Sequence, residues 1–371
     1  MKCRILTLII AFIACLPVWS NVMCGRPQFY NGNRFSSEDI KYVDNSPLPF
    51  NVGFNYCVTV AKIDPSKQLE SIIIPDSITI EGIKFKVIGI DENAFKNHKT
   101  LKNITFGKNI KDIHNHAFYG CVALSEIKIP ATLTYISDNA FDSCISITKL
   151  RVDPQNKNFS SLNNVLYNKD KTLLVKVPEA VYGSIVIPST VSRIESGAFK
   201  DCKGITNVDL PSSVIEISYN SFRGCTNLTS VNLPNSITEI QASAFEECAN
   251  LTSINLPNSI TEIGESAFEG CTNLTDIKLP DNLKTIWNNA FSKSGITSIT
   301  IPLNLTLISD GSFSECKNLR TITFHANIRT CSPTALLGCK NLISINVDPQ
   351  NKYFSSQDGV LYNKDKTKLI C

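Results

Sequence analysis

Residues 251–273 read LTSINLPNSITEIGESAFEGCTN, and the rest of the chain repeats this pattern. The 23 residues before it, 228–250, read LTSVNLPNSITEIQASAFEECAN, and the residues after it begin LTDIKLP. A fixed period of this length is typical of a solenoid, in which one coil cannot bury its apolar side alone and stacks on its neighbours. The sequence therefore predicts a stack of similar coils.

Each coil is expected to begin with a strand that has one buried face. Leu251, Ile254 and Leu256 follow the L-x-x-L-x-L spacing of a leucine-rich repeat. Pro257 ends the strand because it has no N–H for a ladder. Apolar residues then return at 3–4-residue spacing, which predicts a short helical or 3-10 turn on the outer wall. The residues expected to point inward are Leu251, Ile254, Leu256, Ile260, Ile263, Ala267, Phe268 and Cys271.

The strand-opening residues and the coil aromatic show how far the array extends. The strand-opening residues run from Leu69 to Leu342, include Tyr182, and give about twelve coils of 22–23 residues. We therefore expect an α/β leucine-rich repeat solenoid, mostly β, with β-hairpin insertions. The aromatic recurs at Phe95, Phe118, Phe141, Phe199, Phe222, Phe245, Phe268, Phe291 and Phe313, with Leu336 in the same slot.

The chain is predicted to divide into three parts. In residues 1–20, Lys2 and Arg4 precede an apolar run, which is typical of a secretory signal peptide. A buried first helix is one alternative, and a lipoprotein-like box that would leave a lipid anchor at Cys15 is another. Residues 21–68 lack the repeat and are expected to cap the first coil, and residues 69–371 form the array.

Three places in the array depart from the regular coil. Residues 77–90 carry two β-branched runs around Glu81-Gly82, which predicts a β-hairpin. Two coils are enlarged, at 147–181 and 342–371, and each contains VDPQNK followed by FSS, VLYNKDKT and an apolar pair. We expect the Asn-Lys-Asp-Lys segment to be a hairpin loop between two strands.

The cysteines follow the repeat. Free Cys packs as a small apolar residue, so we expect a ladder of buried thiols. Disulfides between stacked coils are the alternative, and a Cys24–Cys57 bridge is expected in the leading segment. Of the 14 cysteines, those lying three residues after the coil aromatic are Cys121, Cys144, Cys202, Cys225, Cys248, Cys271, Cys316 and Cys339.

The pattern LxxIxLPxSIxxIxxxAFxxCxN, together with the VDPxNxxFSSxxxVLYNKDKTxL module, resembles the BspA-like leucine-rich repeat family over residues 69–371. The resemblance implies a secreted or cell-surface protein that is adhesin-like. Members of the family bind host matrix and plasma proteins, other microbes and epithelial cells. The family has no catalytic motif to transfer, and its ligand residues are not set by a motif.

Composition and motifs limit the chemistry that we expect. The net charge of +3, from 36 basic and 33 acidic residues, is too balanced to predict a nucleic-acid partner or an anionic membrane surface. No G-x-S-x-G, H-E-x-x-H, P-loop or G-x-G-x-x-G motif is present, so we expect no catalysis, no cofactor and no metal. After the signal peptide, no apolar stretch is long enough to span a bilayer.

The outward strand positions are mostly short polar residues, with one basic exception on adjacent coils. Lys128, Lys149 and Arg151 precede the first enlarged coil and form a candidate partner-binding site for an acidic protein or polysaccharide. Ordinary solvated strand charges are the alternative. The expected partners are extracellular host matrix or plasma proteins, or cell-surface proteins. A structural spacer or assembly module, and a carbohydrate-binding array, are the competing functions.

Overall fold

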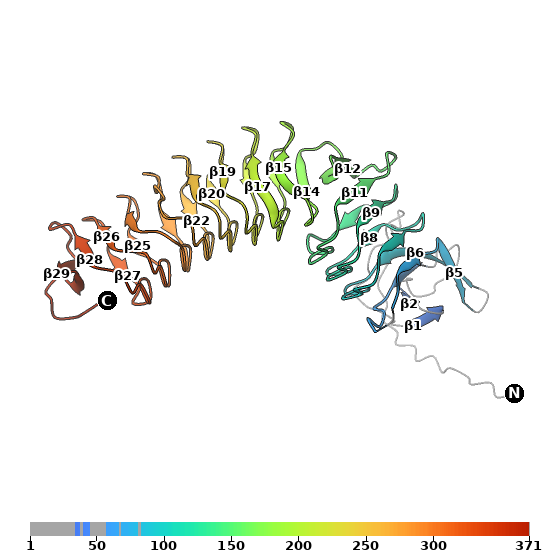
Figure 1. Cartoon of the computed structure of the whole chain (residues 1–371), viewed down its shortest axis with the longest axis horizontal. Helices are drawn as coiled ribbons and strands as arrows, with labels where there is room; N and C mark the ends of the chain where they lie inside the picture. Colours follow the sequence, from blue (N-terminus) through green and yellow to red (C-terminus); the bar gives the residue numbers. More distant parts are fainter. Residues whose placement is uncertain (1–33, 38–39, 45–56, 67, 81–82, 371) are drawn as a thin grey trace, which may run out of the picture.

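The computed structural model describes residues 34–37, 40–44, 57–66, 68–80 and 83–370. These residues form an arch of stacked coils, with β1 (Arg34–Ser37) and β2 (Ile40–Asp44) at one end and β29 (Phe354–Gln357) at the other (Figure 1). All eight residues expected to point inward in coil 251–273 are buried. The predicted solenoid is therefore confirmed.

One side of the stack is a row of short parallel strands that pair in register, as in Ser230 opposite Ser253. We call the outward side of this row the ladder face. The coil that begins at Leu274 adds no strand to it. The row consists of β4 (Ser71–Ile73), β7 (Asn103–Thr105), β9 (Glu126–Ile129), β11 (Lys149–Val152), β15 (Tyr182–Val186), β17 (Gly204–Asp209), β19 (Ser230–Asn232), β21 (Ser253–Asn255), β24 (Ser298–Thr300), β26 (Thr321–Phe324) and β28 (Ser344–Val347).

A second row of mostly two-residue strands forms the next side of the coils. The isoleucines of these strands are inward residues of the repeat, such as Ile240 paired with Ile263. The row consists of β6 (Ile83–Ile90), β8 (Asp112–Ile113), β10 (Tyr135–Ile136), β14 (Leu173–Lys176), β16 (Arg193–Ile194), β18 (Glu216–Ile217), β20 (Glu239–Ile240), β22 (Glu262–Ile263), β23 (Thr285–Ile286), β25 (Leu307–Ile308) and β27 (Thr330–Cys331).

The third side, which we call the turn wall, carries the Ala-Phe-x-x-Cys segments. The described residues contain no helix, so the expected helical turns are hydrogen-bonded turns instead. The Ala267 N–H donates to the Gly264 carbonyl within its coil, whereas the Phe268 N–H donates to the Ala290 carbonyl of the next coil. Since successive N–H groups alternate between local and inter-coil partners, a helical ladder cannot propagate. Ser266, at φ 54°, also leaves the helical region.

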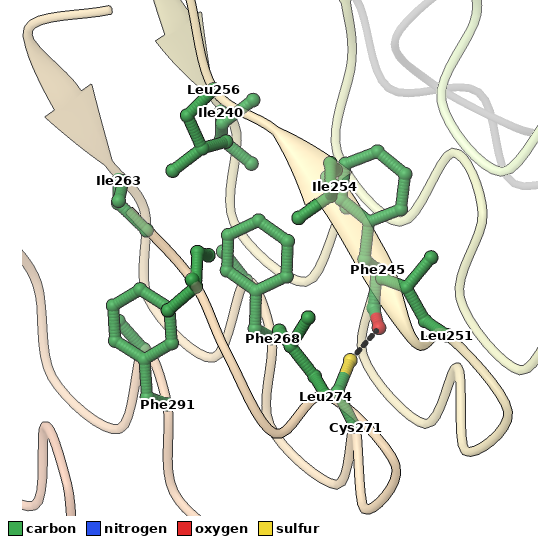
Figure 2. Packing of buried hydrophobic residues seen from close by; sticks show 14 of the residues in the cluster. Ile240, Phe245, Leu251, Ile254, Leu256, Ile263, Phe268, Cys271, Leu274 and Phe291 are labelled. Carbon is green, nitrogen blue, oxygen red and sulfur yellow. Dashed lines mark hydrogen bonds between the residues drawn. The ribbon is translucent and has the colours of Figure 1, made fainter. Parts of the chain in front are cut away.

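The coil aromatics stack into rows inside the solenoid. Figure 2 shows Phe245, Phe268 and Phe291 in one row, with ring centroids 5.5 and 5.3 Å apart and nearly parallel planes. Phe222 joins this row at 5.2 Å from Phe245, as the repeat predicts. Each fully buried ring contributes roughly 1.5–3 kcal/mol by leaving water. The phase of the repeat is therefore held by contacts between equivalent side chains.

The cysteine ladder consists of buried thiols that bond the neighbouring coil. The Cys271 Sγ lies 3.2 Å from the Phe245 carbonyl oxygen, to which it donates (Figure 2). Burial raises the pKa of the Cys121 and Cys316 thiols to about 12, which keeps the donor proton in place. The thiol ladder is confirmed, without disulfides, for Cys121, Cys144, Cys202, Cys225, Cys248, Cys271 and Cys316.

The beginning of the described chain extends the second row. β5 (Ser77–Ile80) pairs antiparallel with β6, which confirms the predicted hairpin. β3 (Cys57–Val60) pairs parallel with β6 and antiparallel with β2, so the leading strands join the same sheet. The signal peptide, Cys15 and Cys24 lie outside the described residues, and the domain boundaries remain predictions. In the part that is described, no helix has the length and apolar character needed to cross a bilayer.

Each enlarged coil inserts a hairpin after its first-row strand. β12 (Phe159–Leu162) pairs antiparallel with β13 (Val165–Asn168), and β13 continues through the predicted loop into β14. In the second copy, β29 pairs with β30 (Val360–Asn363) in the same way. The turns use left-handed pairs, Asn163-Asn164 and Asp358-Gly359. Asp-Gly is a strong hairpin signal, so the first strand of the second hairpin could have been predicted.

Candidate functional site: the ladder face and the first enlarged coil

The predicted basic residues come together on the ladder face. Strand β11 pairs with β9 so that Lys149 lies opposite Glu126 and Arg151 lies opposite Lys128. Lys128, Lys149 and Arg151 are all exposed. The Arg151 Nε lies 3.0 Å from the Glu126 Oε1, so this guanidinium is already paired. Among the residues that the structure describes, Lys128 and Lys149 have no ion-pair partner, so the cluster presents two unpaired cations and one compensated cation.

The next first-row strand, β15, carries two exposed apolar side chains, of which Val186 was expected at an outward position and Tyr182 was not. Tyr182 was expected to open a coil and point inward, but it is 83% exposed, and Val186 is 78% exposed. The pairing of β15 with β17 shifts after Gly183, which takes the slot opposite the buried Ile205. Gly183 adopts φ 83°, a conformation that favours glycine. The bulge thus turns Tyr182 outward and gives the ladder face an aromatic residue.

Strands β13 and β14 separate the interior into two cores. Val165 and Tyr167 pack in the core that extends over the later coils, whereas Leu166, between them, packs in the core of the earlier coils. Leu174 and Val175 divide in the same way. Successive side chains of a strand point to opposite faces, so this strand pair buries both faces and works as a partition. The ladder pairing also stops here, because β11 and β15 belong to different sheets.

The rows of aromatic rings and thiols are interrupted at this partition, and charged side chains are buried there. The Val177 N–H donates to the Ala198 carbonyl, as a coil aromatic does, so Lys176 occupies the slot of the repeat alanine. The Lys176 Nζ lies 3.0 Å from Asp142 Oδ1, and the Lys200 Nζ lies 2.6 Å from Asp142 Oδ2. Burial opposes the charged form of Asp142, but the two lysines outweigh it and lower its pKa. Asp142 therefore links coils on both sides of the partition.

Glu179 lies beside this ion cluster with one oxygen unsatisfied. Its side chain is 8% exposed, and its Oε1 accepts a hydrogen bond from the Ser143 N–H at 2.7 Å. Its Oε2 is buried and has no hydrogen-bond partner within the described residues. Burial raises the pKa of Glu179 to about 7, although Lys176 and the Ser143 N–H act in the opposite direction. This carboxyl group is thus poised to change charge near neutral pH.

A hollow opens next to Glu179 because the turn wall is short in this coil. In the regular array the next coil begins eleven residues after Ile263, at Leu274, whereas here Gly183, in the equivalent position, follows Leu174 by nine. The missing length leaves a hollow of about 250 Å³ between flanking coils, lined by Ser143, Ile145, Glu179, Asp201 and Lys203. In the described ranges, no group of three or more His, Cys, Asp or Glu side chains is arranged to hold a metal ion.

Comparison with known families and structures extends this picture. The model of the BspA type leucine-rich repeat region matches in six copies, over residues 65–182, 179–294 and 238–365. A search of curated proteins by sequence finds no match.

Three solved structures are similar to this chain. A leucine-rich repeat protein from Bacteroides ovatus is 22% identical with a TM-score of 0.53, covering 85% of this chain and 71% of its own. The pneumococcal vaccine antigen PcpA is 17% identical with a TM-score of 0.49, covering 86% and 94%. A leucine-rich repeat protein from Eubacterium ventriosum is 20% identical with a TM-score of 0.41, covering 72% and 95%. The similarity to the Bacteroides ovatus protein supports the solenoid fold and says nothing about function.

Proposed function

We propose, from the premise that this chain belongs to the BspA type leucine-rich repeat family, that it is a secreted or cell-surface protein that binds proteins of a host or neighbouring cell through its ladder face. In this role it is adhesin-like and does no catalysis. The observation that carries the proposal is a set of exposed side chains on the ladder face, made up of Lys128 and Lys149 on β9 and β11 and of Tyr182 and Val186 on β15, across the partition. Within the described residues neither lysine has an ion-pair partner.

The chemistry of this cluster fits a protein partner. Exposed Tyr182 and Val186 offer area that loses water on contact, and tyrosine is common among residues that dominate binding energy. Lys128 and Lys149 add positive charge that speeds association with an acidic surface. Elsewhere the ladder face carries mainly short polar groups. We therefore expect one energetic centre on the face, with weak, extended contacts around it.

The test is a pull-down with the purified chain from serum, matrix and epithelial-cell extracts. Lys128→Glu with Lys149→Glu is the charge variant, and Tyr182→Ala is the apolar variant. The matched control is Lys317→Glu with Lys340→Glu, two exposed lysines that lie on the turn wall. We expect the charge variant to weaken binding by about tenfold or more, and the effect to shrink at high salt.

The outcomes separate this proposal from its competitors. A spacer module gives no saturable binding to any extract. A carbohydrate-binding array loses binding when the extract is deglycosylated and keeps it in Tyr182→Ala. If the ladder-face and control charge variants lose binding equally, the loss is an effect of net charge, and the ladder face is not the binding surface.

A further inference from the structure

We propose that the partner is held by strand addition, in which an extended acidic segment of its polypeptide pairs with the free edge of β15 and directs carboxylates at Lys149 and Lys128. The proposal rests on the proposed function and adds how the ladder face recognises its partner. Strand addition supplies affinity through main-chain hydrogen bonds and selectivity through alternate side chains. It requires an edge strand that is open and is bordered by suitable side chains.

The first support is that β15 has a partner strand on one edge only. It pairs with β17, and no strand of the described residues pairs with the edge that faces β11 across the partition. No Cα atom of β11, β12 or β13 lies within 8 Å of a Cα atom of β15, whereas paired strands lie about 4.8 Å apart. The first row is therefore interrupted between β11 and β15 (Figure 1), and we call this interruption the row break. An unpaired strand edge is a template for another chain.

The second support is that the hairpin of the enlarged coil covers only the β11 side of the row break. The Leu150 N–H donates to the Asn164 carbonyl at 3.2 Å, and the Val152 N–H donates to the Ser161 hydroxyl oxygen at 3.1 Å. Among the described residues, no hydrogen bond joins this hairpin to β15. The hairpin thus satisfies the backbone of β11 and leaves the edge of β15 available to a partner.

The free edge presents the backbone groups of Ser184 and Val186. In a parallel sheet, alternate residues of a strand bond to opposite neighbours. Ile185 is the buried residue equivalent to Leu150, whose N–H points toward the following coil, so the groups of Ile185 bond β17. Ser184 and Val186 alternate with Ile185 and therefore direct their groups into the row break. Val186 is 78% exposed, and a Cβ added at Gly183 would meet no atom within 4 Å, so this edge is open to solvent.

The side chains around the row break favour an acidic segment. An added strand presents alternate side chains on the ladder face, with Lys149 of β11 on one side and Val186 of β15 on the other. Lys128 adds positive charge from β9, whereas Glu126 of the same strand is paired with Arg151. Carboxylates of the segment would therefore meet unpaired ammonium groups. A second copy of this chain would bring its own Lys128 and Lys149 to the same place, so like charges oppose self-association through this edge.

Amide hydrogen exchange in the unaltered full chain, followed by NMR, tests the open edge without a partner. Ser230 and Asn232 are the matched control, because they are the equivalent residues of β19 and are paired with β17. The Ser184 and Val186 amides should exchange at least about tenfold faster than those of the control, since they lack a partner strand. Equal protection would show that the chain itself occupies this edge.

The binding test titrates the full chain with the peptide acetyl-Thr-Asp-Val-Asp-Val-Thr-amide at about pH 7. We expect saturable binding that slows exchange at Ser184 and Val186, and binding at least about tenfold weaker for the counterpart with lysine in place of aspartate. Val186→Pro removes one N–H from the free edge and leaves Ile185 to pair with β17, so binding should weaken about tenfold or more. Val186→Thr keeps the N–H and the branched shape and should change binding by less than about threefold.

Four results would overturn strand addition by an acidic segment. They are protected Ser184 and Val186 amides in the free chain, no saturable binding of the acidic peptide, equal binding of the two peptides, and equal binding by Val186→Pro. The pull-down separates this failure from that of the proposed function. If Val186→Pro still captures the partner and Lys128→Glu with Lys149→Glu does not, strand addition is wrong and the ladder face remains the binding surface. If the unaltered chain captures nothing, both proposals are wrong.

Discussion

Equivalent positions on the turn wall carry different kinds of side chain in the regular coils of residues 205–273 and in the enlarged coil of residues 147–181. In the regular coils, the turn wall holds a small residue, a stacked phenylalanine and a thiol that bonds the preceding coil. In the enlarged coil, the first two slots hold Lys176 and Val177, and Glu179 lies close by. The stacking of phenylalanines and thiols therefore stops at one coil and resumes at Phe199.

This difference separates the scaffold from the places where the molecule can act. Regular coils satisfy their backbone groups on the coils before and after them, so little is left to bind a ligand apart from the ladder face. The partition leaves a bulged strand with an exposed tyrosine, an ion cluster and a hollow. Both candidate surfaces thus lie where the repeat is broken, as expected when local rules give way at functional sites.

Removing one stacked ring from a regular coil should have the largest effect. Phe245→Ala leaves a cavity between Phe222 and Phe268, and we expect a loss of about 3–5 kcal/mol in the free energy of unfolding, measured by urea titration. Ile145→Ala, at a 62% exposed position, should change it by less than about 0.5 kcal/mol. Equal effects would show that stacking does not hold the regular coils together.

Breaking the ion cluster should rank next. Asp142→Asn leaves the buried Lys176 without its counter-charge, and we expect a loss of about 3 kcal/mol by the same titration. Adding Lys176→Met should restore most of that stability, because an apolar side chain suits the site once the carboxylate is gone. If the double variant is as unstable as Asp142→Asn alone, then the two charges do not act as a pair.

The enlarged coil should also make stability depend on pH. Burial raises the folded-state pKa of Glu179 to about 7 from an ordinary value near 4.5, so between these values the folded state holds a proton that the unfolded state has lost. Stability should therefore fall as pH rises through this window, by roughly 2–3 kcal/mol in total. Unfolding titrations at about pH 5 and pH 8 should show this fall in the unaltered chain and a smaller one in Glu179→Gln. The same slope in both would exclude Glu179 as its source.

Sequence alone predicted the regular coils well because their side chains contact copies of themselves. Periodicity therefore reported the inward residues, the phenylalanine rows and the thiol ladder directly. Periodicity also predicted that Lys128, Lys149 and Arg151 lie close together, since equivalent strand positions of adjacent coils lie side by side. The predictions from the sequence were wrong or incomplete where coils differ in length. The bulge at Gly183 turns the Tyr182 side chain outward, and the hollow at Glu179 depends on a turn that is two residues short. The one available signal was Lys176-Val177-Pro178-Glu179, which departs from the repeat.

The smallest expected effect concerns the thiol slot, where the array already contains a natural variant. Cys248 Sγ donates to the Phe222 carbonyl at 3.1 Å, whereas Ser294, in the equivalent slot of a later coil, has its hydroxyl 3.4 Å from the Cys316 Sγ. Cys248→Ser should therefore cost only about 1 kcal/mol, since a hydroxyl can also donate but is more expensive to bury than a thiol.

The reverse change, Ser294→Cys, should be neutral or stabilising by up to about 1 kcal/mol, because it extends the ladder by one thiol–carbonyl bond. Urea unfolding of the two variants measures both effects. If Cys248→Ser costs as much as Phe245→Ala, the thiols do more than fill the slot. The ladder would then rank with the phenylalanine stack as a determinant of the regular coils, and its interruption at the enlarged coil would account for more of that coil's separate chemistry.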